Sequence, residues 1–563
     1  MPLNNKVKNG RGDIKMKTKI YVNGTVVTAD AKSSVCEAIA VAGKKVVGVG
    51  TNAKMLEQFG QDAEVIDLEE KTILPGFYDG HSHVHQVALY SHFVNLEAPP
   101  VGTVDTIEKC LTLLRERAAI TPPGAWIYAS GFTENGVKEK RGLLRKELDE
   151  ISSTNPIYIL DKTLHYLYVN SVTLERAGIN ADTPDPVGGV IWREEDGKTP
   201  NGILEEEAAR NVTNMLTAGK LGDIGTVRDP VAKIEAATLK YAACGVTTAN
   251  DGGTMLKDIP TYQKGAAEGR LHTRVVFNPF YPYRTVSGAE YLDQVDAFDL
   301  DPEWLHMGGI KLMYDGTIQN MSAYLSKPYY TPYKGDASYC GYPSLTKEKL
   351  MEDFTFIHER GKQILIHCNG DAGMDDILDG YKELQEKYPL PDIRHNIIHA
   401  QTIREDQINR AKDQGVFLSL FPPHIFYYGD RHKYTFLGPE RAERLSPAAS
   451  LVKRGMPFSI HCDTPVFPQN PLQTIWTAVN RVTYEGQVLG EAQRISVMDA
   501  IKAYTIHAAY QHHEEKERGS LEAGKYADIV ILAENPLTCD PMKIRDIKVL
   551  ETLINGETAY KAE

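Results

Sequence analysis

The sequence predicts an α/β fold, namely a (β/α)8 TIM barrel with a small β-sandwich and an inserted α+β subdomain. Eight buried-strand runs recur along the chain, with helical stretches between several of them. Short alternating strands occur near both ends of the chain. A gap of about 160 residues separates the first two buried runs, which is too long for a loop and indicates an insertion. The length of 563 residues accommodates a barrel of about 250 residues with accessory units.

The eight runs are short, mostly apolar and bounded by turn residues, as expected for strands buried on both faces. They are ILPGFYDGHSH (73–83), GVTTANDG (245–252), TRVVFNPFY (273–281), GGIKLMYDG (308–316), QILIHCNGD (363–371), NIIHAQ (396–401), VFLSLFPPH (416–424) and PFSIHCDTP (457–465). Helical spacers such as TKEKLMEDFTFIHERG separate several of them. Alternation of strand and helix is typical of a parallel barrel.

The ends of the chain follow a different pattern. KIYVNGTVVTAD alternates apolar and polar residues around an Asn-Gly hairpin signal, and the alternation returns in GKYADIVILAEN. We therefore expect the two ends to build one β-sandwich. The predicted division is a disordered leader (1–17), the β-sandwich (18–74 and 510–563), the barrel (75–89 and 226–509) and a subdomain over the barrel mouth (90–225).

Composition narrows the classes of function. The chain has 62 basic and 75 acidic residues and a net charge of −13, which argues against nucleic acid as a partner. Its seven cysteines are scattered and form no CxxC motif, which favours a reduced, cytoplasmic protein. No stretch of 18 apolar residues is present, so we expect no membrane span.

Six side chains that can bind a metal or transfer a proton lie in these runs, near the strand ends where barrel active sites form. They are His81, His83, Lys311, His367, His399 and Asp463. Alternate residues of a strand point to the same side, so His81 and His83 can bind one ion together. Imidazole and carboxylate suit zinc and related divalent ions.

These motifs resemble the metal motifs of the amidohydrolase superfamily: LPGFYDGHSH, HCNGD, NIIHAQ and SIHCDTPV. The stretch at 164–206, which begins LHYLYVNSVTLERAG, is similar to the amidohydrolase-3 branch, which includes N-substituted formamide deformylases. The resemblance extends from about residue 18 over nearly the whole chain. It implies a barrel flanked by a β-sandwich, and hydrolysis of amide-like C–N bonds at one or two divalent ions, with zinc expected.

The resemblance also implies roles for the six residues. His81, His83 and Asp463 would hold a buried ion, and His367 and His399 a more exposed one. Lys311 matches a position where related enzymes carry a carboxylated lysine that bridges two metals. Asp463 would act as general base and then acid. The implied substrate is a small amide, formamide or carbamate with an aromatic or apolar substituent, and a homodimer is a fair expectation for this branch.

Simpler interpretations stand beside these roles. The two histidines of the first run could be a structural pair, and His367 or His399 a core histidine. Lys311 could be a buried lysine paired with an acid such as Asp315. Asp371, the last residue of HCNGD, is expected to orient a metal ligand rather than to act directly. Two other functions stay open: a deaminase of a small heterocyclic or amidine-like substrate, and a catalytically silent binding or regulatory relative.

Three further histidines are candidates for substrate binding. His85 follows the paired histidines, His165 lies in the inserted segment and His424 follows the seventh run. Each could instead be a loop histidine. His512 and His513, in the charged stretch QHHEEKERG, are expected on the solvated surface.

Overall fold

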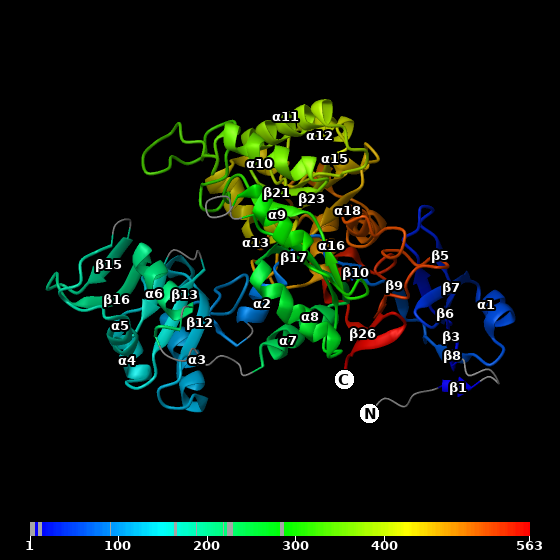
Figure 1. Ribbon diagram of the computed structural model, residues 1–563, viewed down its shortest axis with the longest axis horizontal. Helices are drawn as coiled ribbons and strands as arrows, with labels where there is room; N and C mark the ends of the chain where they lie inside the picture. The colour runs from blue at the N-terminus through cyan, green and yellow to red at the C-terminus, as the bar shows by residue number, and fades with distance from the viewer. Residues whose placement is uncertain are drawn as a thin grey trace. The chain divides into compact units, whose positions relative to one another are not determined.

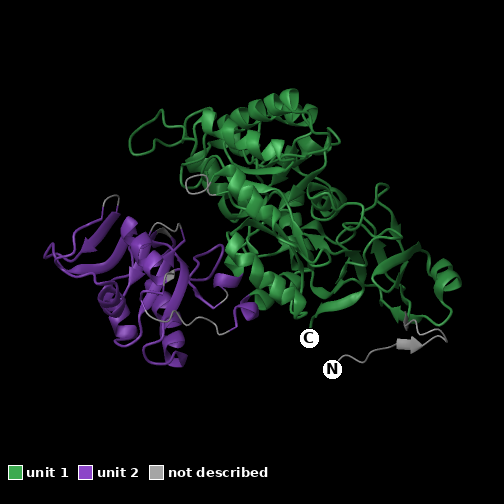
Figure 2. Cartoon of the chain, in the orientation of Figure 1, with its two compact units in different colours: residues 1–87, 234–563 green, residues 88–233 purple. Residues whose placement is uncertain are grey.

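The computed structural model has a mixed α/β fold in two compact units, residues 1–87 with 234–563 and residues 88–233 (Figures 1 and 2). It describes residues 6–8, 14–90, 92–162, 166–186, 189–217, 219–221, 229–281 and 287–563. Among these residues, no helix combines the length and apolar character needed to cross a bilayer.

Two parallel sheets carry the predicted buried runs, and every run contains a strand. One sheet has the order β10-β17-β18-β19 and the other β20-β21-β22-β23-β24. An isolated parallel bridge between Phe280 and Lys311 links the two sheets. The strands are β10 (Phe77–Tyr78), β17 (Val246–Thr254), β18 (Arg274–Pro279), β19 (Leu305–Met307), β20 (Ile310–Met313), β21 (Ile364–Cys368), β22 (Asn396–His399), β23 (Phe417–Leu420) and β24 (Phe458–Ile460).

Helices separate these strands, as the sequence predicts. Thr346 caps the helix before β21, because its side chain accepts from the Lys349 N–H. The strand that follows is buried at all five positions, which explains its unbroken apolar run. The helices of this region are α7 (Pro230–Ala243), α8 (Ile259–Ala267), α9 (Gly288–Asp296), α10 (Lys347–Glu359), α11 (Asp371–Lys387), α12 (Glu405–Asp413), α13 (Pro423–Arg431), α14 (Pro439–Ala442), α15 (Ala448–Val452), α16 (Pro471–Asn480), α17 (Val497–Ala503) and α18 (Ile506–Gln511).

Both ends of the chain contribute to one pair of sheets. The six-stranded sheet has the order β27-β26-β25-β9-β4-β5, and the four-stranded sheet β7-β6-β3-β8. In the first sheet Val530 of β25 pairs with Leu74 of β9, and side chains of both sheets share one buried apolar cluster. The strands are β3 (Lys19–Val22), β4 (Thr25–Val27), β5 (Val35–Cys36), β6 (Ala38–Ala42), β7 (Lys45–Gly50), β8 (Glu64–Asp67), β9 (Thr72–Pro75), β25 (Ile529–Leu532), β26 (Val549–Ile554) and β27 (Glu557–Lys561).

The C-terminal region also reaches the first strand of the parallel sheets. The Tyr78 hydroxyl donates to Glu514 at 2.8 Å, across 436 residues of sequence. His512 stacks on Tyr78 and hydrogen-bonds to Asn250 at 2.9 Å, and only 2% of its surface is exposed. The expectation that His512 lies on the surface was wrong, because its contacts with Tyr78 and Asn250 bury the ring despite its charged neighbours.

The second compact unit has its own six-stranded sheet of order β11-β12-β13-β14-β16-β15. Its first three strands are parallel and the others antiparallel. Two separate apolar clusters contain residues of this sheet. The elements are β11 (Val94–Asn95), α3 (Ile107–Ile120), β12 (Ile127–Phe132), α4 (Arg145–Ile151), β13 (Ile157–Asp161), β14 (Tyr166–Val169), α5 (Ser171–Ala177), β15 (Gly189–Arg193), β16 (Pro200–Glu206) and α6 (Glu207–Thr217).

Candidate metal centre

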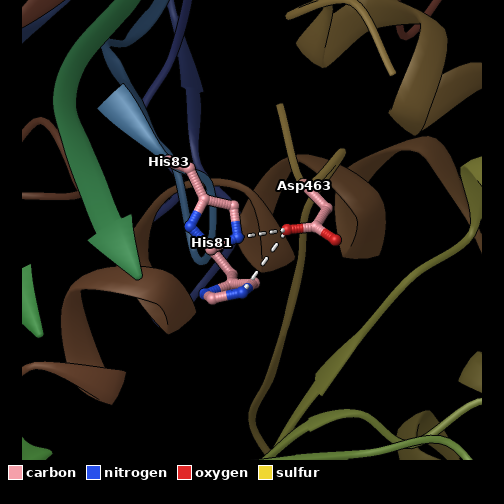
Figure 3. Close-up of side chains that lie close together, drawn as sticks. All are labelled: His81, His83 and Asp463. Atoms are coloured by element: carbon pink, nitrogen blue, oxygen red, sulfur yellow. Dashed lines mark ion pairs between the residues drawn. The ribbon is translucent and has the colours of Figure 1, made fainter. Parts of the chain in front are cut away.

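Two histidines after β10 converge with an aspartate after β24 (Figure 3). Nε2 of His83 lies 3.2 Å from Oδ1 of Asp463, and Nε2 of His81 lies 3.4 Å from the same oxygen. One ligand atom from each residue lies within 4.8 Å of the other two. His81 and Asp463 are buried, and His83 is partly exposed. These three donors can hold one metal ion.

The backbone around the two histidines is tightly fixed. The His83 N–H donates to the Thr464 carbonyl at 2.7 Å, and the Gly252 N–H donates to the Ser82 carbonyl at 2.6 Å. A Cβ atom on Gly252 would stand 2.1 Å from the His81 ring, so only glycine lets β17 pass there. The ring of His81 is therefore held in place by the neighbouring strand.

Two of the candidate ligands have strained backbones. His399 has a φ of 78° and Asp463 a φ of 54°, values in the left-handed region that non-glycine residues rarely adopt. Such strain persists only where the surrounding structure enforces it, and it concentrates at functional sites. At the ends of β22 and β24, the surrounding tertiary structure therefore holds the backbone in a conformation that these residues would not adopt by themselves.

Lys311 lies on β20, with its Nζ 3.2 Å from Nε2 of His81. Its side chain is buried, and burial lowers its pKa from the usual 10.5 to about 7 against the opposing pull of Asp463. Asp315 is not its partner within the described chain, so the alternative of a Lys311–Asp315 pair was wrong.

His367 on β21 and His399 on β22 lie side by side, with ring centroids 4.6 Å apart. His399 is also 5.4 Å from the His81 ring, centroid to centroid. His399 therefore borders the ring of His81, and His367 is connected to the first three donors only through His399.

Asp315 connects the end of β20 to the end of β21. Its two oxygens accept the N–H groups of Asn369 at 2.9 Å, Gly370 at 2.7 Å and Tyr324 at 3.0 Å. Oδ1 also lies 3.3 Å from Nδ1 of His367. Asp315 therefore fixes the backbone after β21 and lies beside the His367 ring, the position from which a carboxylate would orient that ring if it bound a metal.

Asp371 has a different partner from the one expected. Its carboxylate accepts from the backbone and hydroxyl of Ser326 and from Arg404 at 3.1 Å. The expectation that it orients a metal ligand was wrong, because Asp371 begins α11 and points toward the loop that follows β20 rather than toward His367.

The three substrate-binding candidates have different positions. His85 lies in α2 (Val84–Tyr90), where its N–H donates to Asp251 and its Nδ1 is 3.5 Å from Asp258. His165 lies outside the described residues. His424 lies in α13, is buried, and has its Nδ1 3.1 Å from Nε2 of a second histidine, His432.

Sequence reasoning missed His461, which lies two residues before Asp463. Its ring is fully buried, 5.3 Å from His81, 5.1 Å from His399 and stacked on Phe421 at 4.7 Å between centroids. Neither ring nitrogen makes a hydrogen bond among the described residues. The signal was available, since residues two apart on a strand share a side.

The ionisation states suit a metal site. Burial holds the pKa of His81 and His399 well below the usual value, so both imidazoles are neutral. Burial alone would raise the pKa of Asp463, but the nearby His83, His461 and Lys311 lower it to about 2, which keeps the carboxylate ionised. Oδ1 of Asp463 and Nδ1 of both neutral imidazoles are buried without hydrogen-bond partners in the described structure. Neutral imidazole and ionised carboxylate are the forms that bind divalent metals.

Known proteins resemble this chain over most of its length. An N-substituted formamide deformylase of Arthrobacter pascens is 28% identical over 555 residues, which cover 97% of this chain and 99% of the relative. Protein LONG AFTER FAR-RED 3 of Arabidopsis thaliana is 29% identical over 558 residues, or 96% and 91% of the two chains. The crystal structure of an uncharacterized metal-dependent hydrolase from Pyrococcus horikoshii OT3 is 25% identical with a TM-score of 0.73, covering 93% of this chain and 99% of that one. The sequence model of the amidohydrolase family matches residues 64–560, and the chain therefore belongs to that family.

Proposed function

We propose that the protein is a metal-dependent hydrolase that cleaves a non-peptide C–N bond of a small substrate. The observation that carries the proposal is the group of His81, His83 and Asp463, whose donor atoms converge within 4.8 Å. Within it the imidazole of His81 is neutral and the carboxylate of Asp463 is ionised, which are the forms that bind a divalent ion. The name of the Arthrobacter relative supports an N-substituted formamide, amide or carbamate as substrate class.

The residues have distinct parts in this proposal. In the proposal His81, His83 and Asp463 hold one ion, His367 and His399 hold a second, and zinc is the expected metal. A divalent ion at such a site lowers the pKa of water and polarises the scissile carbonyl. Oδ1 of Asp463 faces the two histidines, so Oδ2 is available to accept the proton of the attacking water and pass it to the leaving nitrogen.

Lys311 is proposed to be carboxylated and to bridge the two ions. An unmodified ammonium at this position would be repelled by the two metal ions. A carbamate is an anion, so it would be attracted to both ions. The lowered pKa supports this, because only the neutral amine attacks CO2. Extra mass corresponding to one CO2, lost on acidification, would identify the modification.

We also propose that the two parallel sheets are halves of one (β/α)8 barrel. The Phe280–Lys311 bridge supports the junction between β18 and β20. On the other side, the His83–Thr464 backbone hydrogen bond ties the residues after β10 to those after β24. A barrel places all the candidate ligands at one end, where barrel enzymes have their active sites.

Elemental analysis of purified protein, followed by amine release from a panel of N-substituted formamides, amides and carbamates, tests the function. We expect one or two divalent ions per chain and release of amine from at least one class. Trace metal only, or a fully loaded protein that releases no amine from the panel, would contradict the proposal. The second outcome would favour a binding or regulatory relative.

A further inference from the structure

His424 and His432 form a buried pair beside the candidate metal centre. They are the second residue of α13 and the first residue of the π-helical segment that continues it, His432–Phe436. Although eight residues separate them, their rings stack with centroids 5.4 Å apart. Nδ1 of His424 and Nε2 of His432 are 3.1 Å apart, which is a hydrogen bond.

The ring of His424 is connected to the candidate metal centre through one intervening ring. It packs on Phe421 with centroids 4.5 Å apart, and Phe421 in turn contacts the rings of His399 at 5.2 Å and His461 at 4.7 Å. The other nitrogen of His424, Nε2, makes no hydrogen bond to any described residue. Nothing in the described structure therefore competes with a ligand for this atom.

The hydrogen bond allows two tautomeric arrangements of the neutral pair. In the first, His432 carries its proton on Nε2 and donates it, so His424 accepts at Nδ1 and carries its own proton on Nε2. In the second, His424 donates from Nδ1, so His432 must carry its proton on Nδ1. Burial keeps the pKa of both rings well below the usual value, so neither ring carries two protons.

The surroundings of His432 distinguish the two arrangements. Its Nδ1 is buried and has no hydrogen-bond partner within the described residues. The second arrangement would place an unpaired N–H there, and unpaired buried N–H groups are rarer in proteins than under-used acceptors. The first arrangement leaves only an unused lone pair. It also leaves a proton on Nε2 of His424.

Resting on the proposed function, we propose that His432 is a positioning residue that fixes His424 as an Nε2–H donor to the substrate carbonyl oxygen. His424 then complements Asp463, because one donates to the oxygen that gains charge while the other accepts a proton from water. A donor aimed at a developing oxyanion acts mainly on the transition state.

The experiment uses full-length, metal-loaded protein labelled with 15N-histidine. Two-bond 15N–1H spectra distinguish protonated from unprotonated ring nitrogens, and the His424→Gln spectrum assigns the signals of His424. We expect Nε2 of His424 to be protonated in the wild type, and a mixture of tautomers in His432→Phe. Protonation of Nδ1, or an unchanged tautomer in His432→Phe, would overturn the proposal.

Kinetics give a second readout. We expect His432→Phe to lower kcat about 10-fold with little change in KM, and His424→Gln to lower it on the order of 10²-fold. His432→Gln retains a side-chain N–H donor and should restore most of the lost kcat. His272→Phe removes a histidine whose ring instead contacts the Ala559 carbonyl, and it is the matched control. An equal loss in His432→Gln and His432→Phe would also overturn the proposal.

The two proposals fail separately. An inactive wild type contradicts the hydrolase function, while the tautomer of His424 is read by spectroscopy without any substrate.

Discussion

Nζ of Lys311 lies 3.2 Å from Nε2 of His81, although 230 residues separate them in sequence. An ammonium so close to a neutral imidazole that is a candidate metal ligand would repel any cation bound there. In the proposed function, Lys311 is therefore neutral or carboxylated when a metal is bound. We expect Lys311→Met to bind less metal than the wild type, and bicarbonate added during reconstitution to raise the active fraction of the wild type but not of Lys311→Met.

Asp463→Asn should reduce turnover by about 10³-fold, because an amide cannot accept the proton of water. The amide oxygen can still approach a metal, so much of the metal should remain. Steady-state kinetics and elemental analysis of the same sample measure both effects. Asp62→Asn, at an exposed loop position, controls for the change in charge. Near-wild-type kcat in Asp463→Asn would remove Asp463 from the proposed chemistry.

Chelation should destabilise the protein. An ion bound only by the native state at 100 times its dissociation constant stabilises that state by about 2.7 kcal/mol. We expect Tm to fall on treatment with a chelator and to recover on adding zinc, whereas His83→Ala should respond weakly to either. A Tm of the wild type that is indifferent to chelator would show that no ion contributes to the folded state.

Asp315→Asn should destabilise the fold by about 2 to 4 kcal/mol. The carboxylate accepts three backbone N–H groups, from Tyr324, Asn369 and Gly370, and an amide would turn a donor toward some of them. Urea unfolding measures the loss. Asp336→Asn is the matched control, since the exposed Asp336 also accepts a backbone N–H, from Ser338 at 2.8 Å.

Stability should fall in acid because of buried histidines such as His395. Its Nδ1 accepts the Ile364 N–H at 3.0 Å and its Nε2 lies 2.8 Å from His358, and burial lowers its pKa from 6.5 to about 3. Between about pH 6.5 and 3, His395 therefore binds a proton in the unfolded chain but not in the folded protein. The contribution is therefore complete above pH 6.5 and is lost as the pH falls from 6.5 toward 3.

Each proton taken up only by the unfolded state changes stability by roughly 1.4 kcal/mol per pH unit. Asn at position 395 keeps an acceptor for Ile364 and cannot titrate, so His395→Asn should flatten the pH dependence of the free energy of unfolding between pH 6 and 4. His272→Asn, which removes a half-buried histidine elsewhere, should leave the slope steeper. Identical slopes in the two variants would contradict the interpretation.

The strands were predictable because buried parallel strands leave continuous apolar runs. The convergence of His81, His83 and Asp463 was also predictable, because the residues that follow neighbouring parallel strands meet at one edge. His461 could also have been predicted from its spacing to Asp463. The partners of Asp315 and Asp371 could not be predicted from the sequence. The two acids lie in similar turns, and their different partners depend on which loops pack beside them in the folded structure. The burial of His512 was wrongly predicted because the prediction rested on its charged sequence neighbours. Its ring is in fact buried against Tyr78, which belongs to a strand more than 400 residues earlier.

The pairing of Leu74 with Val530, and of Tyr78 with Glu514, has a consequence for synthesis in the cell. At about 5 to 20 residues per second, a ribosome needs roughly 20 to 90 s to make the 436 residues between Tyr78 and Glu514. During that interval β9 can pair with β4, which precedes it, but its other edge has no strand partner until β25 emerges. The nascent chain must therefore keep one apolar edge of β9 shielded until its last strands arrive, so assembly of this protein is completed only after translation is almost over.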